Sequence, residues 1–482
     1  MNFLMSNSKL TLCYSYIASV ILVAILNLTF MAVTGEFSNL MQSDNSHFVK
    51  ALSPKYPEVG VSSPNGPTIL DDNLKAEVVF KGLRYPTSMA FLGPSDILVT
   101  EKDEGTVQRI LNGTKIQQPL LNVSVAKSGH RGMLGIATIP PVASSRYSDL
   151  KNASSHNNNN NNNYVFLYYS KAQSYAGDDV AEGKQPLGNL LYRYELISNK
   201  LMNPKLLLSL PATPGSIGNG GKVTVGPDNN VYLTIGDVGI NGHITKAQNI
   251  QNGREPDGTS GILRVTQDGL PILPGVLGNE YPLNLYYSYG IWNSFGLAFD
   301  PITSILWDTQ IGLPFGDEIN RVDPGFNSGY NKVEGIWLHG YNMDQTEKHI
   351  APPYPNDLVD FDRKGKYHPP QFTWFDKVVP TGITFLNSNN MGNLYKNDMF
   401  VADAKRGNIY HFKLDAQRTG IMLPIGPLAE GVANSSDSLD QIIFGKGFGA
   451  ITDLKANPYD GNLYALTFDE KQGTVFRIVP NN

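Results

Sequence analysis

The sequence predicts an all-β protein, a six-bladed β-propeller, on three observations. The 482 residues include 47 Gly and 31 Pro, with 41% hydrophobic and 17% charged residues, a composition typical of a fold with many turns. Short apolar segments alternate with Pro/Asp/Asn/Gly turns. This strand–turn–strand unit recurs without intervening helical periodicity. Such units are too small to bury their own faces, so we expect them to stack around a central channel.

The clearest unit is a β-hairpin that ends at Asp237. Residues Lys222–Val225 and Val231–Ile235 predict two strands joined by a Gly-Pro-Asp-Asn-Asn turn. A Gly-rich segment, residues 215–221, leads into this hairpin. Asp237 then places a carboxylate where the chain leaves the sheet. We therefore expect Asp237 to face the mouth of the channel, although a strand-end Asp that caps a turn is the simpler alternative.

Six segments carry the repeated pattern of apolar strand, turn, second strand and a closing strand of the type Gly-x-Ile-x-Arg-Ile. They are residues 89–110, 135–196, 222–265, 296–322, 382–412 and 454–478. We expect about four strands in each unit, as propeller blades have.

The N-terminal residues 1–34 contain an apolar segment, Leu10–Val33, preceded by Lys9. At about 1.5 Å per residue such a helix spans the roughly 30 Å of bilayer hydrocarbon. The segment is long for a signal peptide and no Ala-x-Ala site follows it. We predict an uncleaved signal anchor, with an extracytoplasmic, membrane-anchored domain; a cleaved or lipid-processed signal, which would leave that domain secreted, and a buried helix are the alternatives.

The rest of the chain divides into a stalk and one large domain. Residues 35–72 are polar and lack periodicity, so we expect a linker, and residues 73–482 form the predicted propeller. Residues 151–163 form a low-complexity Asn-rich loop. The net charge of -5 and the lack of a basic tract argue against a nucleic-acid partner. The single cysteine, Cys13, lies in the apolar segment, which excludes disulfides from the exported part. The oligomeric state is left open.

Three motifs carry a resemblance to a known family: Gly-His-Arg-Gly-Met-Leu-Gly at 129–135, Gly-Gly-Lys-Val-Thr-Val-Gly-Pro-Asp at 220–228, and Gly-Asp-Glu-Ile-Asn at 316–320. From about Asp72 onward the sequence resembles the glucose/sorbosone dehydrogenase family of soluble quinoprotein aldose dehydrogenases. The resemblance implies a propeller that oxidises aldose sugars with pyrroloquinoline quinone (PQQ) and calcium. In the family a histidine accepts the proton of the sugar hydroxyl, while Arg and Lys side chains hold the cofactor's carboxylates.

Several of the family's functional positions are changed in this chain. The catalytic histidine falls on Gly218, and Trp292 stands where an arginine contacts the quinone. Ala450 and Thr452 occupy the positions of an arginine pair in the last blade. The resemblance places His130 at a cofactor-facing position, and we predict it as a surrogate base; a loop histidine without catalytic role is the alternative.

Other positions are kept, and the resemblance gives each a role. Asp237 orients the base, and we predict it to be catalytic together with His130. The predicted cofactor-binding residues are Asn293, Lys405, Lys222 and Trp292. The predicted calcium ligands are the carbonyls of Gly312 and Leu313 and the side chain of Glu318. Lys405 as an exposed hairpin charge and Trp292 as a core residue are the structural alternatives.

These residues leave two functions open. The first is PQQ-dependent oxidation of an aldose sugar, with His130 and Asp237 in place of the usual base. The second is a non-catalytic, calcium-stabilised propeller that binds a glycan or protein partner at the same mouth. A metal hydrolase of the gluconolactonase type ranks below both, because the channel carboxylate and Asn ligands of that class are absent from the sequence.

Overall fold

The computed structural model describes most of the predicted propeller domain. The described residues are 60, 62–139, 163–172, 187–212, 217–239, 244–313, 315–338, 350–352, 355–434, 436–469 and 472–481. They belong to a compact unit that runs from Glu58 to Asn482. The predicted signal anchor at 1–34, most of the stalk and almost all of the Asn-rich loop lie outside the described residues. Within the described ranges, no helix has the length and apolar composition needed to cross a bilayer.

The described residues form strands in seven sheets, and their helical elements are short 3₁₀ turns. The first sheet comprises β3 (Pro86–Gly93), β4 (Asp96–Glu101), β5 (Thr106–Leu111), β6 (Thr114–Lys115) and β7 (Leu121–Asn122). The second comprises β8 (Met133–Thr138), β9 (Tyr164–Lys171), β10 (Gly188–Ile197) and β11 (Lys200–Leu210). The third comprises β12 (Val223–Val225), β13 (Val231–Ile235), β14 (Gly261–Val265), β15 (Tyr286–Tyr289), β19 (Phe326–Asn327) and β22 (Lys366–Tyr367).

The remaining sheets follow in chain order. The fourth comprises β16 (Ser294–Phe299), β17 (Leu306–Gln310), β18 (Asp317–Val322), β23 (Phe372–Trp374) and β28 (Val432–Ala433). The fifth comprises β24 (Pro380–Phe385), β25 (Met399–Asp403), β26 (Ile409–Leu414), β27 (Ile421–Met422), β29 (Ile443–Lys446) and β1 (Thr68–Ile69). The sixth comprises β2 (Leu74–Leu83), β32 (Gly473–Pro480), β31 (Leu463–Phe468) and β30 (Ala450–Ala456). A small seventh sheet pairs β20 (Val333–Glu334) with β21 (Trp337–Leu338), and the 3₁₀ turns are η2 (Lys246–Gln248), η3 (Leu283–Leu285), η4 (Asn393–Tyr395) and η5 (Ser436–Gln441).

The predicted all-β propeller is confirmed, but the count of six equivalent repeats needs correction. In five of the described sheets, the fourth strand (β6, β11, β15, β23 or β29) follows the third along the chain. The remaining sheet takes its fourth strand, β2, from the opposite end of the described chain, where it pairs with β32. The sequence pattern missed β2 because residues 74–83 carry no turn motif of the repeat. Long-range antiparallel pairing, which no local pattern encodes, decides this sheet.

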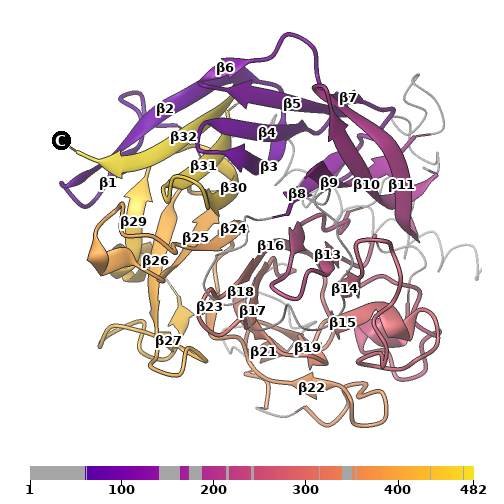
Figure 1. The fold of residues 1–482 in the computed structure, drawn as a ribbon. Coiled ribbons are helices and arrows are strands. Elements are labelled where there is room, and N and C mark those ends of the chain that lie inside the picture. The colour runs from indigo at the N-terminus through magenta and orange to yellow at the C-terminus, as the bar shows by residue number, and fades with distance from the viewer. Residues whose placement is uncertain are drawn as a thin grey trace, which may run out of the picture. The chain divides into compact units, whose positions relative to one another are not determined.

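The first strands of neighbouring sheets meet around a common centre (Figure 1). Among the described residues, each first strand contacts the first strand of the next sheet. The order around the ring is β30, β3, β8, β12, β16 and β24, and β24 contacts β30 again. Glycine makes this approach possible. A side chain added at Gly135 of β8 would overlap the carbonyl of Gly221, and one at Gly382 of β24 would stand 2.6 Å from the backbone nitrogen of Leu454. The outer strands extend away from this centre, so the ends of the first strands and their loops lie together.

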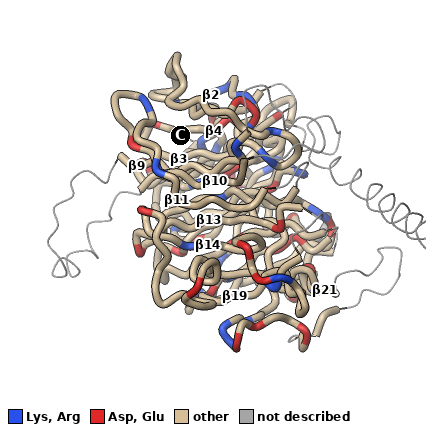
Figure 2. Tube along the Cα trace, turned by 90° about the vertical axis from the view of Figure 1, so that its right-hand side faces the viewer, with Lys and Arg blue, Asp and Glu red and all other residues tan. Residues whose placement is uncertain are grey.

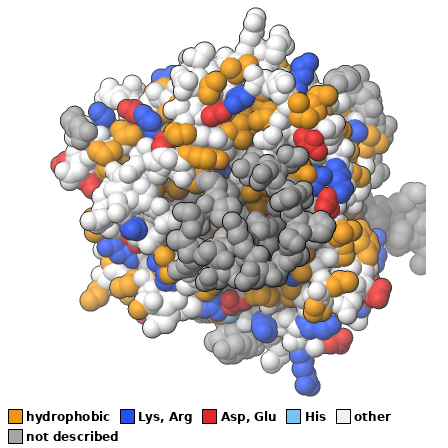
Figure 3. Space-filling model, in the orientation of Figure 1, with side chains coloured by type: hydrophobic (Ala, Val, Ile, Leu, Met, Phe, Trp, Pro, Cys, Tyr) orange, Lys and Arg blue, Asp and Glu red, His pale blue; other side chains and the backbone are white. Residues whose placement is uncertain are grey.

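Basic and acidic residues are interspersed along the chain (Figure 2). The face drawn in Figure 3 shows the same mixture of basic, acidic and apolar groups around its rim. Apolar side chains form clusters between the sheets. The residues that pack β30 against its neighbours include Leu454, Leu463 and Ile451, all fully buried.

The packing of one sheet on the next can be tested at Leu454. Truncating this fully buried side chain in Leu454→Ala should lower the free energy of unfolding by about 2–5 kcal/mol, because it opens a cavity between β30 and β24. Urea unfolding followed by circular dichroism measures the change. The control is Leu394→Ala, since Leu394 is 60% exposed. Equal effects of the two substitutions would contradict the packing described.

Candidate functional site

The candidate site is built around the loop Gly218–Gly221, which precedes β12. Its backbone is tied to three elements: the amide of Gly218 donates to Nδ1 of His130 (3.3 Å), that of Gly220 to Oδ1 of Asn293 (2.9 Å), and that of Gly221 to the carbonyl of Thr234 (2.9 Å). Gly218, Gly220 and Gly221 all have positive φ, the region that glycine adopts without strain. The Gly-rich sequence therefore permits a loop that faces three partners at once.

Asp237 lies directly against Gly218, as its place at the end of β13 predicts. A Cβ at Gly218 would stand 2.6 Å from Oδ1 of Asp237, so the carboxylate occupies the space that a side chain at 218 would need. The carboxylate is 3% exposed and is held at both oxygens: Oδ1 accepts from the amide of Gly239 (3.0 Å) and Oδ2 from the hydroxyl of Tyr330 (2.9 Å). These two bonds fix the direction of the carboxylate at the loop.

His130 contributes a neutral imidazole from the segment before β8. Burial, together with the positive charges of Lys102 and Lys377, lowers the pKa of His130 to about 3. Because Nδ1 accepts the amide hydrogen of Gly218, the proton of the neutral ring sits on Nε2. That Nε2 is buried and has no hydrogen-bond partner among the described residues. His130 therefore presents an N–H donor to the site.

Asn293 presents a second donor of the same kind. The side chain is fully buried, its Oδ1 accepts the amide of Gly220, and its Nδ2 has no hydrogen-bond partner in the described part of the chain. Buried donors without partners are rare in folded proteins because leaving one unpaired costs about 1–3 kcal/mol. Two such donors beside one loop point to a ligand that supplies acceptor oxygens.

A lysine lies beside Trp292, the residue before Asn293. The backbone carbonyl of Trp292 accepts the amide of Asp237 (3.0 Å), and the ammonium of Lys377 lies 5.8 Å from the centre of the Trp292 ring. Burial lowers the pKa of Lys377 to about 8. The negative charges of Asp317 and Glu334 act against this decrease, and the positive charge of Lys405 adds to it. The exposed Lys405 is carried by the β25–β26 turn. Asp237 is thus linked to Trp292, the residue before Asn293, while Lys405 lies near enough to Lys377 to affect its pKa.

Lys377 is a residue that the sequence reasoning missed. It lies between β23 and β24, in Phe375-Asp-Lys-Val-Val-Pro380, outside every repeat and family motif considered above. The signal in the sequence was a lysine just before an apolar strand. A lysine at the start of a strand is ordinarily solvated, so this signal is weak. Only the approach of the β25–β26 turn to Val378 and Val379 places it beside Lys405.

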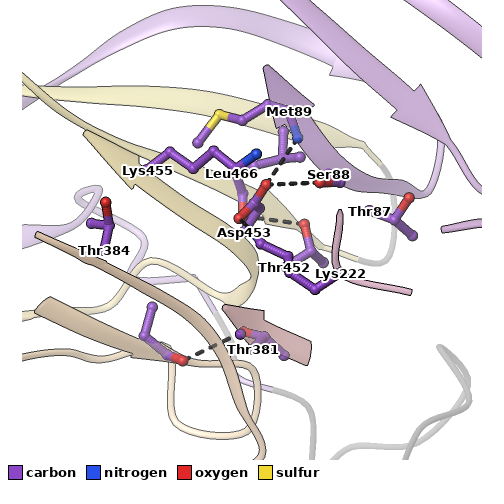
Figure 4. A network of polar contacts seen from close by, with 12 residues as sticks. Thr87, Ser88, Met89, Lys222, Thr381, Thr384, Thr452, Asp453, Lys455 and Leu466 are labelled. Carbon is purple, nitrogen blue, oxygen red and sulfur yellow. Dashed lines mark hydrogen bonds and ion pairs between the residues drawn. The ribbon is translucent and has the colours of Figure 1, made fainter. Parts of the chain in front are cut away.

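Lys222 and Trp292 occupy different surroundings from those expected of cofactor-binding groups. The ammonium of Lys222 forms an ion pair with Asp453, and both side chains are buried (Figure 4). Trp292 is 1% exposed, so its ring packs inside the domain. No comparison tests these two roles, which stay predictions. The geometry favours Lys405 and Lys377 over Lys222 as the cations that face a ligand.

The predicted calcium ligands lie around the start of β18. The amide of Gly312 donates to Oδ1 of Asp317 (3.0 Å), and that of Leu313 to Oε2 of Glu334 (3.2 Å). Glu318 is 4% exposed and accepts hydrogen bonds from Gly335, Asn320 and Ser328. Burial raises the pKa of Glu318 well above its usual range. In the described ranges no group of three or more Asp, Glu, His or Cys side chains has a metal-binding arrangement, so calcium stays a prediction.

The described residues thus form a β-propeller with two buried donors, His130 Nε2 and Asn293 Nδ2, beside the Gly218–Gly221 loop. Comparison with known families identifies the lineage. The sequence matches the model of the Glucose / Sorbosone dehydrogenase family over residues 83–477. The chain therefore belongs to the glucose/sorbosone dehydrogenase family, as its motifs predicted.

Individual relatives are distant. An uncharacterized protein of Synechocystis is 25% identical over 415 residues, which cover 84% of this chain and 86% of that protein. The aldose sugar dehydrogenase YliI of Escherichia coli is 23% identical over 418 residues, which cover 85% of this chain and 94% of the enzyme. The PQQ-bound aldose sugar dehydrogenase of Streptomyces coelicolor has a similar fold, with a TM-score of 0.54 at 22% identity, covering 86% of this chain and 100% of that one.

The contact between Gly218 and Asp237 can be tested by adding a single methyl group. Gly218→Ala should destabilise the protein more than Gly82→Ala. Both positions have positive φ, but only the methyl group at 218 meets a neighbour, Oδ1 of Asp237 at 2.6 Å. The shared backbone strain costs about 1–2 kcal/mol, and the difference between the variants reports the contact. Thermal unfolding measures it, and equal melting temperatures would argue against the close approach.

Proposed function

We propose that this chain is a PQQ-dependent sugar dehydrogenase that oxidises an aldose and uses Asp237 as the proton acceptor. The observation that carries the proposal is the position of the Asp237 carboxylate. It fills the space beside Gly218, the point at which the resemblance places the family's catalytic histidine. The family's activity and the names of its aldose sugar dehydrogenase relatives support the substrate class.

The donor set suits the proposed cofactor. PQQ carries three carboxylates and two quinone oxygens, so it offers many acceptors and a high negative charge. The buried N–H groups of Asn293 and His130 and the ammonium groups of Lys405 and Lys377 would hold it. When bound, the quinone supplies the hydride acceptor for sugar oxidation. Lys222 takes no part in this arrangement, because Asp453 holds its ammonium group.

Asp237 would accept the proton of the sugar hydroxyl. The hydrogen bonds from Gly239 and Tyr330 keep its carboxylate oriented toward Gly218. A carboxylate is a weaker base than an imidazole, with ordinary pKa values of about 3.9 and 6.5. Proton transfer to Asp237 is therefore less favourable than to a histidine, and we expect slower turnover than in relatives that keep the histidine. His130, whose Nε2 carries a proton, would donate a hydrogen bond to a ligand oxygen instead of acting as the base.

The second candidate is a non-catalytic propeller that binds a glycan or protein partner at the same mouth. The lack of a side chain at Gly218 and the burial of Trp292 at the arginine position favour it. Calcium as a structural ion and an extracytoplasmic position reached through residues 1–34 belong to both proposals. The two candidates differ in whether a sugar is oxidised.

The enzymatic proposal makes a prediction for Asp237. With added PQQ and calcium, the purified chain should reduce an artificial dye in the presence of an aldose. Asp237→Asn should lower kcat by about 10²- to 10⁴-fold, because the amide cannot accept the proton. Asp228→Asn, in the exposed turn of the same hairpin, is the matched control and should keep full activity. Dye reduction that survives in the Asp237 variant would exclude this base.

The structural role of calcium has its own test. Chelation with EGTA should lower the melting temperature of the purified chain, since an ion that binds only the folded state stabilises it. Glu318→Gln should remove the difference between chelated and calcium-loaded samples. Glu77→Gln, at a partly exposed ion pair with Arg477, serves as the control and should keep it. A melting temperature insensitive to EGTA would remove calcium from the proposal.

A further inference from the structure

One buried ion pair lies outside the ligand-facing groups and crosses the centre of the ring of first strands. Lys222 immediately precedes β12, and Asp453 belongs to β30. In the contact order of the described first strands, β12 and β30 are three strands apart in either direction. The Lys222–Asp453 pair therefore joins opposite sides of the ring. Figure 4 shows the lysine side chain reaching to the carboxylate of Asp453.

Asp453 joins three sheets at this point. Its Oδ1 accepts the ammonium of Lys222, and its Oδ2 accepts the hydroxyl of Ser88 (3.0 Å) and the amide of Met89 (2.9 Å) on β3. The exposed fractions of the Lys222 and Asp453 side chains are 4% and 0%. Burial alone would raise the pKa of Asp453, but Lys222 and Lys455 lower it below its usual range. The carboxylate is thus ionised and saturated with donors.

The same lysine directly follows the Gly218–Gly221 loop of the candidate site. The backbone amide of Lys222 donates to Oγ1 of Thr234 (3.0 Å), directly after Gly221. Four residues earlier, Gly218 contacts His130 and Asp237. Three of the four residues of the loop Gly218–Gly221 are glycines with little intrinsic stiffness, so its position depends on the contacts that hold it, at its amides and at its ends. The ion pair supplies a fixed point at the end next to β12.

We propose that Asp453 is a positioning residue for the candidate site: through Lys222 it holds the Gly218–Gly221 loop in place from the opposite side of the ring. The site's link to sugar oxidation rests on the proposed function, but the positioning itself does not. A buried pair contributes little net stability compared with well-packed apolar groups, whereas removal of one partner leaves an uncompensated charge. Stability and loop position can therefore be separated by experiment.

The experiment compares three variants of the full chain: Asp453→Asn, Lys222→Met, and the double variant with Lys222→Met and Asp453→Leu. Melting temperature reports stability, and hydrogen–deuterium exchange of peptides covering 217–239 reports the loop. We expect both single variants to melt lower and the double variant to recover most of the loss. Hydrogen–deuterium exchange in 217–239 should be at least about tenfold faster than in the wild type in all three variants, because each lacks the ion pair. The apolar pair of the double variant restores packing but does not replace the ion pair.

The matched control is Arg477→Met, which breaks a partly exposed ion pair with Glu77 in the same sheet as Asp453. It should leave exchange in 217–239 unchanged. If the double variant exchanged at the wild-type rate in 217–239, the pair would have only a packing role and the inference would be overturned. An unchanged exchange rate in Asp453→Asn would overturn it as well. The measurement needs no cofactor, so failure of the wild-type chain to bind PQQ would remove the proposed function and leave this result standing.

Discussion

Close contact between the first strands of neighbouring sheets is the constraint on which the rest of the structure depends. The backbones approach so closely that a side chain at Gly135 or Gly382 would overlap the next strand. A larger residue would separate the sheets and widen the ring. With glycine at these positions, strands far apart in the sequence bring their ends and loops to one place. The candidate site is a consequence of that convergence.

Convergence also explains why the site tolerates changes in its chemistry. The sheets pack through apolar residues such as Trp307 and Leu454, which belong to hydrophobic clusters that contain none of the candidate site residues. Loss of a histidine or an arginine at the mouth therefore leaves the fold intact. The chain has buried N–H donors at His130 and Asn293, and lysines at 377 and 405, near the Gly218–Gly221 loop and Trp292. Family membership and efficient family chemistry are separate questions for this protein.

Much of the fold and part of the site followed from local patterns. The hairpin before Asp237 formed with the predicted strands, because a Gly-Pro-Asp-Asn-Asn turn between apolar strands is a local signal. Asp237 lies against Gly218, and Asn293 accepts the amide of Gly220, while the functional roles of both residues stay predictions. The place of β2, the environment of Lys377 and the pairing of Lys222 with Asp453 did not follow. Each depends on segments that are distant in sequence, and partner choice among charged residues has no local signature.

The sequence by itself determined the all-β class, the repeated unit, the family and the Gly-rich loop, because turn chemistry and strand alternation act over a few residues. Tertiary structure alone decided which carboxylate faces Gly218, which nitrogen of His130 carries the proton, and which carboxylate pairs with Lys222. These properties depend on burial and on contacts across the ring. Only the folded chain brings such groups within a few ångströms of one another.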